Sequence, residues 1–299
     1  GINPISIYKA ISYFKKKRFD IIHTHSPRSD LLAYSSNLFL KNKGKRIVTI
    51  HGKYGTYLQG NFLIDFLRKI FIKQQSKIWE KANKVIVISE SIRDWLEKLN
   101  SSIKPTVIPY GVEIQEVSQK NKLANPTLGY LGKLNKNKGI EDLIDVYTKF
   151  QEKENSSNFE LTLLIGGTVS EQYVEILKNK IKGNNVKFLG YVEDRYSFFE
   201  SIEIFVFPSY SEGLGLVLLE AMAHGVICIT RDVTPMNSIV DNEENGFLFK
   251  DNKELLEKIE MVLNLNSTEK NKLVQSAIKK IEKSYSIMQM YLSTEKAYN

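Results

Sequence analysis

Residues 205–225, FVFPSYSEGLGLVLLEAMAHG, form the stretch from which the fold of this chain is deduced. The apolar residues 204–208 predict a strand, and the turn-forming residues 209–215 predict a loop. A helix is expected from there through Ala223, with Gly225 closing it. Strands also alternate with helices in both halves of the chain, which indicates an α/β protein with two doubly wound parallel sheets.

The start of this helix is a candidate site for a phosphate or diphosphate. Backbone amides at a helix N-terminus are unpaired donors, and here they belong to Gly213, Leu214, Gly215, Leu216 and Val217. The glycines allow a ligand to approach the backbone because they carry no Cβ.

Two glutamates flank these amides. Glu212 lies in the loop, and Glu220 lies about one and a half turns into the helix. A carboxylate accepts hydrogen bonds from neighbouring hydroxyls, so Glu220 suits a ribose and Glu212 suits a sugar. The alternative is a surface loop with two solvated acids.

The segment SEGLGLVLLEAMAHG resembles the Glu-x7-Glu signature of the retaining nucleotide-sugar glycosyltransferases of family four, which have the GT-B fold. The motif is specific, and further matches follow in the same order from about Phe19 to the C-terminus. The resemblance implies two Rossmann-like domains that face a cleft. It also implies sugar transfer with retention of anomeric configuration and without a metal.

Residues 126–139, PTLGYLGKLNKNKG, predict a strand, a loop with Gly132 and Lys133, and a helix that begins near Gly139. No Gly-Lys-Ser/Thr follows at the spacing of a P-loop. In the family, two cations at this position clamp the donor diphosphate, which implies that role for Lys133 and Lys138. Lys133 replaces an arginine, and it keeps the charge but loses the bidentate geometry. Solvated loop lysines are the alternative.

Two other segments match the family. After the strand at residues 186–189, the family holds the nucleotide base on main-chain groups, which implies this role for Tyr191 and Val192. HTHSP at residues 23–27 lies where the family has a histidine beside the transferring sugar. This implies the role for His25, with Ser26 and Arg28 in the following loop. A histidine that caps a strand end is the alternative.

His23 and His25 share one face of the expected strand, as a metal-binding pair would. His51 and His224 are the other histidines of the chain, and no metal-ligand spacing follows from them. We therefore expect no metal site.

Residues 61–82, NFLIDFLRKIFIKQQSKIWEKA, predict an apolar and basic helix. Its apolar residues have helical spacing, at Phe62, Phe66, Ile70 and Phe71. Basic residues are interleaved with them, at Arg68, Lys69, Lys73 and Lys77. We expect a helix that packs on the core, and a helix that lies in a membrane surface is the alternative.

The chain has 299 residues, of which 42% are hydrophobic and 25% charged, as expected for one large or two ordinary domains. We expect an acceptor-side domain at residues 1–118, joined by a C-terminal helix at 285–299, and a nucleotide-sugar-binding domain at 119–284. Residues 113–125 suit a linker. Full-length family members begin with additional β-α units, so the resemblance implies a first domain truncated at its start.

The net charge is +8. An anionic nucleotide-sugar or an anionic membrane surface explains this charge. No nucleic-acid-binding signature accompanies it, so we expect no nucleic-acid partner. Cys228 is the single cysteine, which fits a reducing compartment. Without a visible signal peptide or membrane span, we expect a cytoplasmic protein or one on the inner face of the plasma membrane.

The family resemblance, together with these features, implies a glycosyltransferase of bacterial cell-surface glycan or glycolipid synthesis. It would use a UDP- or GDP-sugar and a sugar or lipid-linked acceptor, with no cofactor beyond the donor. Lys133, Lys138 and the amides of residues 213–217 would stabilise the leaving diphosphate, and Glu212 and His25 would lie around the sugar. The alternatives are a catalytically silent nucleotide-binding fragment and a GT-B epimerase or phosphorylase.

Overall fold

The structure is a computed structural model that describes residues 4–17, 19–40, 44–54, 62–114, 125–154, 160–168, 171–181 and 185–299. The chain forms two compact units: unit 1 comprises Gly1–Tyr110 and Met290–Asn299, and unit 2 comprises Gly111–Gln289. The boundaries expected from the sequence are residues 118 and 285. The expected linker at 113–125 lies mostly outside the described residues.

Unit 2 is built on a six-stranded sheet with the order β10-β9-β8-β5-β6-β7. All of its paired strands are parallel. Every residue of β5, β8 and β9 is buried, as expected for parallel strands covered on both faces. The strands are β5 (Thr127–Leu131), β6 (Thr162–Gly166), β7 (Val186–Gly190), β8 (Ile204–Phe207), β9 (Ile227–Arg231) and β10 (Phe247–Phe249).

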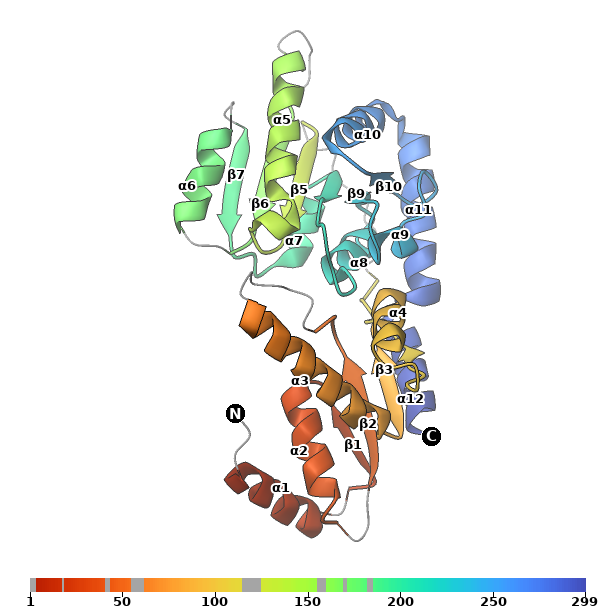
Figure 1. Cartoon of the computed structure of the whole chain (residues 1–299). Coiled ribbons are helices and arrows are strands. Elements are labelled where there is room, and N and C mark those ends of the chain that lie inside the picture. The colour runs from red at the N-terminus through yellow and green to blue at the C-terminus, as the bar shows by residue number, and fades with distance from the viewer. Residues whose placement is uncertain are drawn as a thin grey trace. The chain divides into compact units, whose positions relative to one another are not determined.

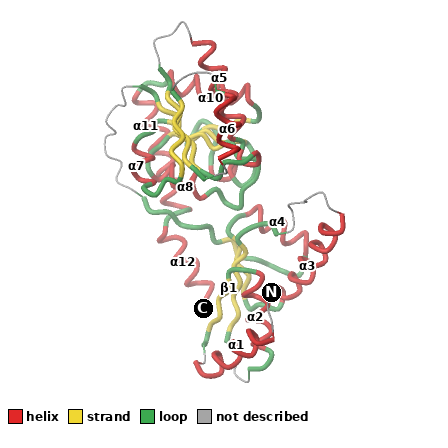
Figure 2. The backbone as a smooth tube through the Cα atoms, turned by 90° about the vertical axis from the view of Figure 1, so that its left-hand side faces the viewer, coloured by secondary structure: helices red, strands yellow, loops and turns green. Residues whose placement is uncertain are grey.

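Helices lie on both sides of this sheet (Figure 2). One layer contains α5 (Ile140–Glu154), α6 (Glu171–Lys180) and α10 (Asn252–Asn264), which contact one another through α5. The other layer contains α8 (Leu216–Ala223) and α11 (Ser267–Ser284). Three short helices lie in the connections: η1 (Lys136–Lys138, a 3-10 helix), α7 (Arg195–Glu200) and α9 (Met236–Ile239). Unit 2 therefore has the doubly wound arrangement expected from the sequence.

Unit 1 has a four-stranded parallel sheet with the order β1-β2-β3-β4 (Figure 1). Its strands are β1 (Ile21–Thr24), β2 (Lys45–Ile50), β3 (Lys84–Val87) and β4 (Thr106–Val107). Its helices are α1 (Pro4–Lys17), α2 (Pro27–Asn37), α3 (Phe62–Glu80) and α4 (Glu90–Leu99). The C-terminal helix α12 (Ile287–Tyr298) packs Met290, Ala297 and Tyr298 against the core of this sheet.

The helix α2 begins where the sequence analysis placed a loop. Ser26 is its N-cap and Pro27 its first residue, and Ser29 completes a capping box with Ser26. Arg28 therefore lies in the first turn of a helix, and its expected place in a loop was wrong.

The helix α3 is present, but the side chains expected in the core are not buried. Phe66, Ile70 and Phe71 are 50%, 43% and 53% exposed. The side chain of Phe62 lies outside the described residues. The buried face of α3 is formed by Ile72, Gln75, Ser76 and Trp79. The core-packing interpretation of the apolar residues was therefore wrong, because helical spacing identifies a face but not what covers it.

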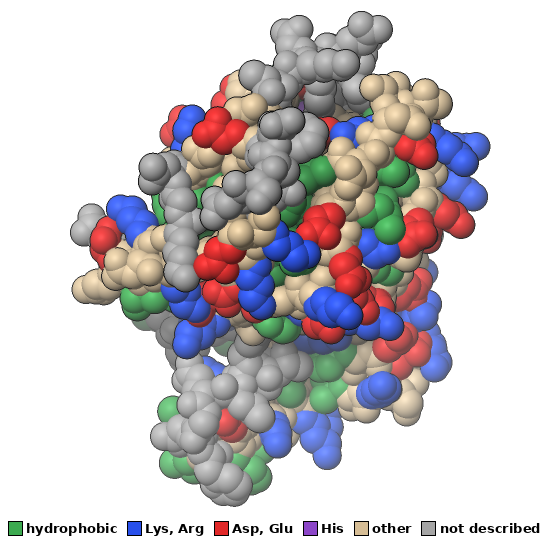
Figure 3. Space-filling model, turned by 90° about the horizontal axis from the view of Figure 1, so that it is seen from above, with side chains coloured by type: hydrophobic (Ala, Val, Ile, Leu, Met, Phe, Trp, Pro, Cys, Tyr) green, Lys and Arg blue, Asp and Glu red, His purple; other side chains and the backbone are tan. Residues whose placement is uncertain are grey.

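Charged side chains of both signs are intermixed over the face of the molecule that Figure 3 shows. The net charge of +8 is thus not gathered into a single basic patch on that face. Within the described residues, no helix is long and apolar enough to cross a membrane.

Candidate functional site

The chain reverses its direction across the sheet of unit 2 next to β5. It first moves from β5 through β6 to β7 at one edge, and then returns to β8 on the other side of β5. Doubly wound sheets bind ligands outside the carboxyl ends of the strands at such a reversal. The segments that follow β5 and β8 carry Lys133, Lys138 and Glu212, so three residues predicted from the sequence lie in the connections at this point.

Lys138 and Glu212 form an ion pair in which Nζ lies 2.7 Å from Oε1. Both side chains are largely shielded, with 25% and 14% of their surface exposed. Lys138 ends η1, where its backbone N–H donates to the side chain of Asn135 at 3.1 Å. Lys133 is exposed, and it takes part in none of the ion pairs among the described residues. The structure thus joins one of the two predicted cations to a predicted sugar ligand.

A close backbone approach makes this pair possible. Gly139 follows Lys138 with a φ of 66°, a conformation that favours glycine. A Cβ at Gly139 would lie 2.1 Å from the carbonyl oxygen of Pro208, so a side chain there would separate the two loops. The backbone N–H of Tyr210 donates to the carbonyl of Asn137 at 3.0 Å and fastens the loops further.

Backbone hydrogen bonds connect the segments at the carboxyl ends of β5, β6 and β7. Gly132 donates its N–H to the carbonyl of Gly166 at 3.0 Å, and Gly167 donates to that of Gly190 at 2.7 Å. Tyr191 is 69% exposed just beyond this contact. The side chain of Val192 lies against Gly166, where an added Cβ would come within 2.8 Å of it. The predicted base-binding segment, Tyr191 and Val192, is therefore connected through these loops to the loop that contains Gly132.

The helix α8 begins at Leu216, within the segment that the sequence analysis predicted to bind an anion. Gly215 is its N-cap, with a φ of 86°, and its carbonyl already accepts from the amides of Leu218 and Leu219. The amides that open the helix are therefore those of Leu216 and Val217. Gly213 takes part in another interaction, and the side chain of Leu214 is buried. The amides of Leu216 and Val217 lie within the segment 213–217 that the sequence analysis named as an anion site, and that site stays a prediction.

Glu220 is paired with a cation that the sequence analysis did not name. Nη1 of Arg195 lies 2.7 Å and 2.8 Å from the two carboxylate oxygens of Glu220. Arg195 is the first residue of α7, and Asp194 caps this helix by accepting the N–H of Ser197. The Asp at the N-cap position was the sequence signal for α7. A ligand that binds Glu220 would meet a carboxylate that Arg195 already orients.

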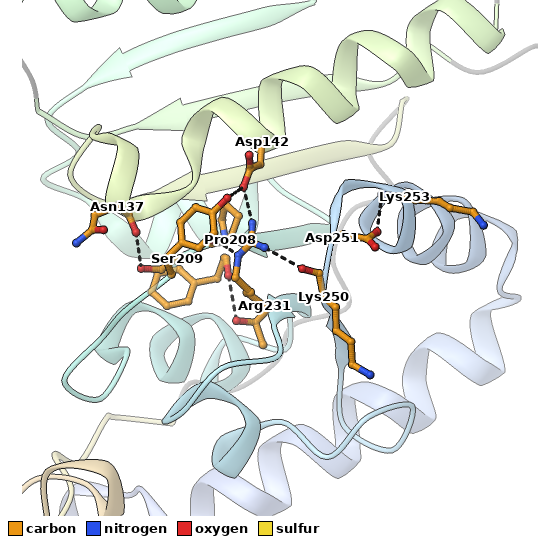
Figure 4. Close-up of polar contacts among 11 residues, drawn as sticks. Asn137, Asp142, Pro208, Ser209, Arg231, Lys250, Asp251 and Lys253 are labelled. Atoms are coloured by element: carbon orange, nitrogen blue, oxygen red, sulfur yellow. Dashed lines mark hydrogen bonds and ion pairs between the residues drawn. The ribbon is translucent and has the colours of Figure 1, made fainter. Parts of the chain in front are cut away.

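Arg231, at the end of β9, holds the base of the loop that leads to Glu212 (Figure 4). Its Nε donates to the carbonyl of Pro208 at 3.0 Å, and its Nη1 donates to that of Lys250 at 3.0 Å. Its Nη2 forms an ion pair of 2.5 Å with Asp142 of α5. Because the guanidinium is buried, these three contacts supply the partners that a buried charge requires.

The ring of Tyr210 completes this arrangement. The guanidinium carbon of Arg231 lies 4.0 Å from the centre of the ring, within the range of a cation–π contact. The Tyr210 hydroxyl donates to Asp142 at 2.6 Å, which raises the pKa of Tyr210. Asp142 thus accepts from the guanidinium and from the residue stacked on it. The sequence analysis missed Arg231, although an arginine that ends the apolar run ICITR was a visible signal.

His25 lies in unit 1, directly after β1, as part of a row of aromatic side chains. Its Nδ1 lies 3.1 Å from Nε2 of His51. Nδ1 of His51 in turn contacts the hydroxyl of Tyr110. Burial, followed by the charge of His25, lowers the pKa of His51. The sequence analysis did not foresee the contacts of His51 with His25 and Tyr110.

His23 is fixed on two sides and lies beside His25, with 4.2 Å between ring centroids. Its Nε2 is 2.7 Å from Oγ1 of Thr49, and its Nδ1 is 2.8 Å from the hydroxyl of Tyr298. Burial, together with the charges of His25 and His51, lowers its pKa from 6.5 to about 4. The ring is therefore neutral near pH 7. In the part of the chain that the structure describes, no group of three or more His, Cys, Asp or Glu is placed to hold a metal ion.

Comparisons with known proteins agree with this architecture. The family described as "Glycosyl transferases group 1" matches residues 113–280, and "Glycosyltransferase Family 4" matches residues 1–116. The capsular polysaccharide biosynthesis glycosyltransferase CapM of Staphylococcus aureus is 27% identical over 98% of this chain and 80% of its own length.

Solved structures show the same fold. Sucrose-phosphate synthase from Thermosynechococcus elongatus superposes with a TM-score of 0.83 at 22% identity, covering 99% of this chain and 77% of that one. The protein HepE of Anabaena, in complex with UDP-glucose, gives 0.79 at 17% identity and covers 98% and 83%. The chain has the GT-B fold, as the sequence predicted, and it belongs to the group 1 glycosyl transferases.

Proposed function

We propose that this glycosyltransferase takes a sugar from a nucleotide-sugar, in particular a UDP- or GDP-sugar, and transfers it with retention of anomeric configuration. The acceptor is a sugar or a lipid-linked sugar in bacterial cell-surface glycan synthesis, and the reaction uses no metal. The observation that carries the proposal is the Lys138–Glu212 ion pair at the reversal of the unit 2 sheet. In this proposal the cation of the pair binds the donor diphosphate, and the carboxylate beside it accepts hydrogen bonds from sugar hydroxyls.

The pair supports a simple order of events in donor binding. A diphosphate carries more negative charge than one carboxylate, so Lys138 exchanges Glu212 for the phosphate oxygens. Glu212 is then available to accept hydrogen bonds from the donor sugar. As the bond between the anomeric carbon and the diphosphate breaks, Lys133, Lys138 and the first amides of α8 stabilise the charge on the leaving group.

Glu220 binds the ribose hydroxyls in this proposal while Arg195 fixes the orientation of its carboxylate. The backbone of Tyr191 and Val192 holds the base. The role of His25 beside the transferring sugar remains a prediction of the family resemblance. These assignments give each predicted residue a task that one part of a nucleotide-sugar requires.

The relatives support the class of donor and acceptor. One of them is named as an O-antigen biosynthesis glycosyltransferase of Escherichia coli. Another Escherichia coli relative is named for UDP-Gal and for an acceptor linked to diphosphoundecaprenol. A lipid-linked acceptor lies at a membrane, so the proposal includes peripheral contact with an anionic membrane on the cytoplasmic side.

A thermal-shift series with UDP, GDP and ADP, each with and without EDTA, tests the donor site. We expect one nucleoside diphosphate to stabilise the protein, equally in the presence of EDTA. Lys138→Gln should reduce this shift, and Lys272→Gln, an exposed lysine on α11, serves as the matched control. No shift with any nucleotide, or an unchanged shift in Lys138→Gln, would contradict the proposed donor site.

The transfer itself is tested with the matching radiolabelled nucleotide-sugars and a bacterial lipid extract as acceptor. We expect label in a lipid-extractable product whose anomeric proton couplings show the configuration of the donor. A product of inverted configuration would rule out retention.

A further inference from the structure

The helix α3 presents a buried face along its C-terminal half and an exposed apolar face along its N-terminal half. One face buries Ile72, Gln75, Ser76 and Trp79 within unit 1. At about 100° per residue, the exposed residues Leu67, Ile70 and Phe71 lie on the opposite side. Leu63, Ile64 and Phe66 extend this exposed face toward the start of the helix. Large apolar side chains exposed together in this way mark an interaction surface.

A row of lysines borders this apolar face. Lys69, Lys73 and Lys77 are exposed and follow one another at intervals of four residues, so they lie along one edge of the helix. The two acidic residues of α3 do not offset this row. Asp65 lies 4.0 Å from Arg68, and Glu80, at the far end, accepts a hydrogen bond from Asn100. The edge of the apolar face is therefore positively charged.

This combination determines the kind of partner. An apolar face with a basic edge matches the two layers of a bilayer surface, in which acyl chains lie beneath anionic headgroups. A second copy of the chain would bring an identical lysine row close to the first, and the like charges would repel. Charge complementarity therefore favours an anionic lipid surface over self-association.

We propose that α3 lies in the surface of an anionic bilayer, with Leu67, Ile70 and Phe71 inserted and Lys69, Lys73 and Lys77 at the headgroups. The inference rests on the membrane contact in the proposed function and identifies the surface that makes it. It does not depend on sugar transfer. A test with vesicles and no donor therefore distinguishes a failure of this inference from a failure of the proposed donor chemistry.

The experiment is sedimentation of the full 299-residue chain with vesicles. Vesicles of phosphatidylcholine mixed with phosphatidylglycerol should bind the protein, and vesicles of phosphatidylcholine alone should bind it much more weakly. Each lysine at an anionic surface contributes enough that replacing all three by Gln should weaken binding on the order of a hundredfold. The double variant Leu67→Gln/Phe71→Gln should weaken it by at least about tenfold.

Two control variants make the same changes elsewhere in the chain: one removes three lysines, and the other removes two exposed apolar side chains. Replacing Lys272, Lys279 and Lys283 of α11 by Gln removes three exposed lysines from another helix. Ile176→Gln/Leu189→Gln removes two exposed apolar side chains of unit 2. Both controls should bind like the original chain. Circular dichroism and the UDP, GDP and ADP thermal shifts show whether each variant is folded and retains its nucleotide site.

The outcomes separate clearly. Equal losses in the control and α3 variants would overturn the assignment to α3. Absence of binding to both kinds of vesicle, or equal binding to both, would overturn the anionic-surface proposal. If the chain instead self-associates and the double variant abolishes that association, the occupant is a second copy and the proposal is wrong.

Discussion

The predicted site residues of the two units have different kinds of partner: ion pairs in unit 2 and aromatic rings in unit 1. In unit 2, the residues at the reversal of the sheet are paired charges, with Lys138 on Glu212 and Arg195 on Glu220. In unit 1, the residue predicted to lie beside the sugar, His25, belongs to a row of aromatic rings that contains two imidazoles of lowered pKa. Unit 2 therefore carries charged pairs at this point, whereas His23 and His51 in unit 1 are neutral near pH 7 because their pKa values are lowered.

The units also differ in how much of their apolar surface is exposed. The central strands of unit 2 are buried under two helix layers. Unit 1 leaves large apolar side chains exposed along α1 and α3. The contrast teaches that the +8 net charge of the chain serves two separate purposes in these proposals: binding a nucleotide in unit 2 and contacting lipid in unit 1.

The largest effect is expected from the buried arginine of unit 2. Arg231→Met leaves Asp142 without its cation and the carbonyls of Pro208 and Lys250 without a donor. Breaking a buried charge pair by removing one partner costs about 3–5 kcal/mol. Urea unfolding followed by circular dichroism should show this loss, and the nucleotide-induced thermal shift should disappear.

Arg46 provides the matched control in unit 1. It is also buried, and it donates to the carbonyl of Ile78. Arg46→Met should destabilise unit 1, which contains both tryptophans, Trp79 and Trp95, and should therefore change the fluorescence transition. It should keep the nucleotide shift. If both variants lose that shift equally, Arg231 has no special role in the donor site.

The next effect concerns the ribose ligand. Glu220→Ala should weaken the donor and the free nucleoside diphosphate alike, because both contain the ribose. A hydrogen bond to a charged group contributes about 1.5–3 kcal/mol, which corresponds to a loss of roughly ten- to a hundredfold. Calorimetry with UDP and GDP measures it, and unchanged affinity would refute the assignment. Glu254→Ala, in the first turn of α10, is a control at another helix N-terminus.

The lowered pKa of His23 predicts that acid reduces the free energy of unfolding of unit 1. His23 has a pKa of about 4 in the folded protein and 6.5 in the unfolded chain, so the unfolded chain binds more protons between these values. Its contribution to stability is therefore complete above pH 6.5 and is lost as the pH falls toward 4. We expect a loss of about 1–2 kcal/mol after allowing for solvent screening.

Tryptophan fluorescence reports this change in unit 1 directly, since both tryptophans lie there. His23→Gln should flatten the dependence of the free energy of unfolding between pH 6.5 and 4. An equally steep dependence in this variant would mean that other groups cause it.

The smallest expected effect is a gain in nucleotide affinity from Lys133→Arg. Lys133→Arg restores the planar, bidentate group that fits a diphosphate better than an ammonium does. Because Lys133 is exposed, we expect no change in the melting temperature of the free protein and a few-fold higher affinity for the nucleoside diphosphate. A weaker affinity in calorimetry would show that the guanidinium does not fit the site.

Much of the fold was predictable because its signals are local. The strand β5 ends at Leu131, directly before the predicted loop with Gly132 and Lys133, and β8 (Ile204–Phe207) lies within the predicted strand 204–208. Ser89 caps α4 by accepting the backbone N–H of Ile92, which is a local signal of a helix start. The same kind of signal was available for α2, in Ser26 and Pro27, but it was not used. Apolar runs, caps and turn residues act over a few neighbours, so they can be recognised without the rest of the chain.

By itself, the sequence determined the alternation of strands and helices, the candidate residues Lys138, Glu212 and Glu220, and the apolar spacing of α3. Only the tertiary structure decided their partners. Lys138 and Glu212 meet across 74 residues, and Arg231 and Asp142 meet across 89, because the sheet order brings the connections after β5, β8 and β9 together. Only the tertiary structure also showed that Phe71 faces solvent, since a side chain's burial depends on what packs over it and not on its spacing along the helix.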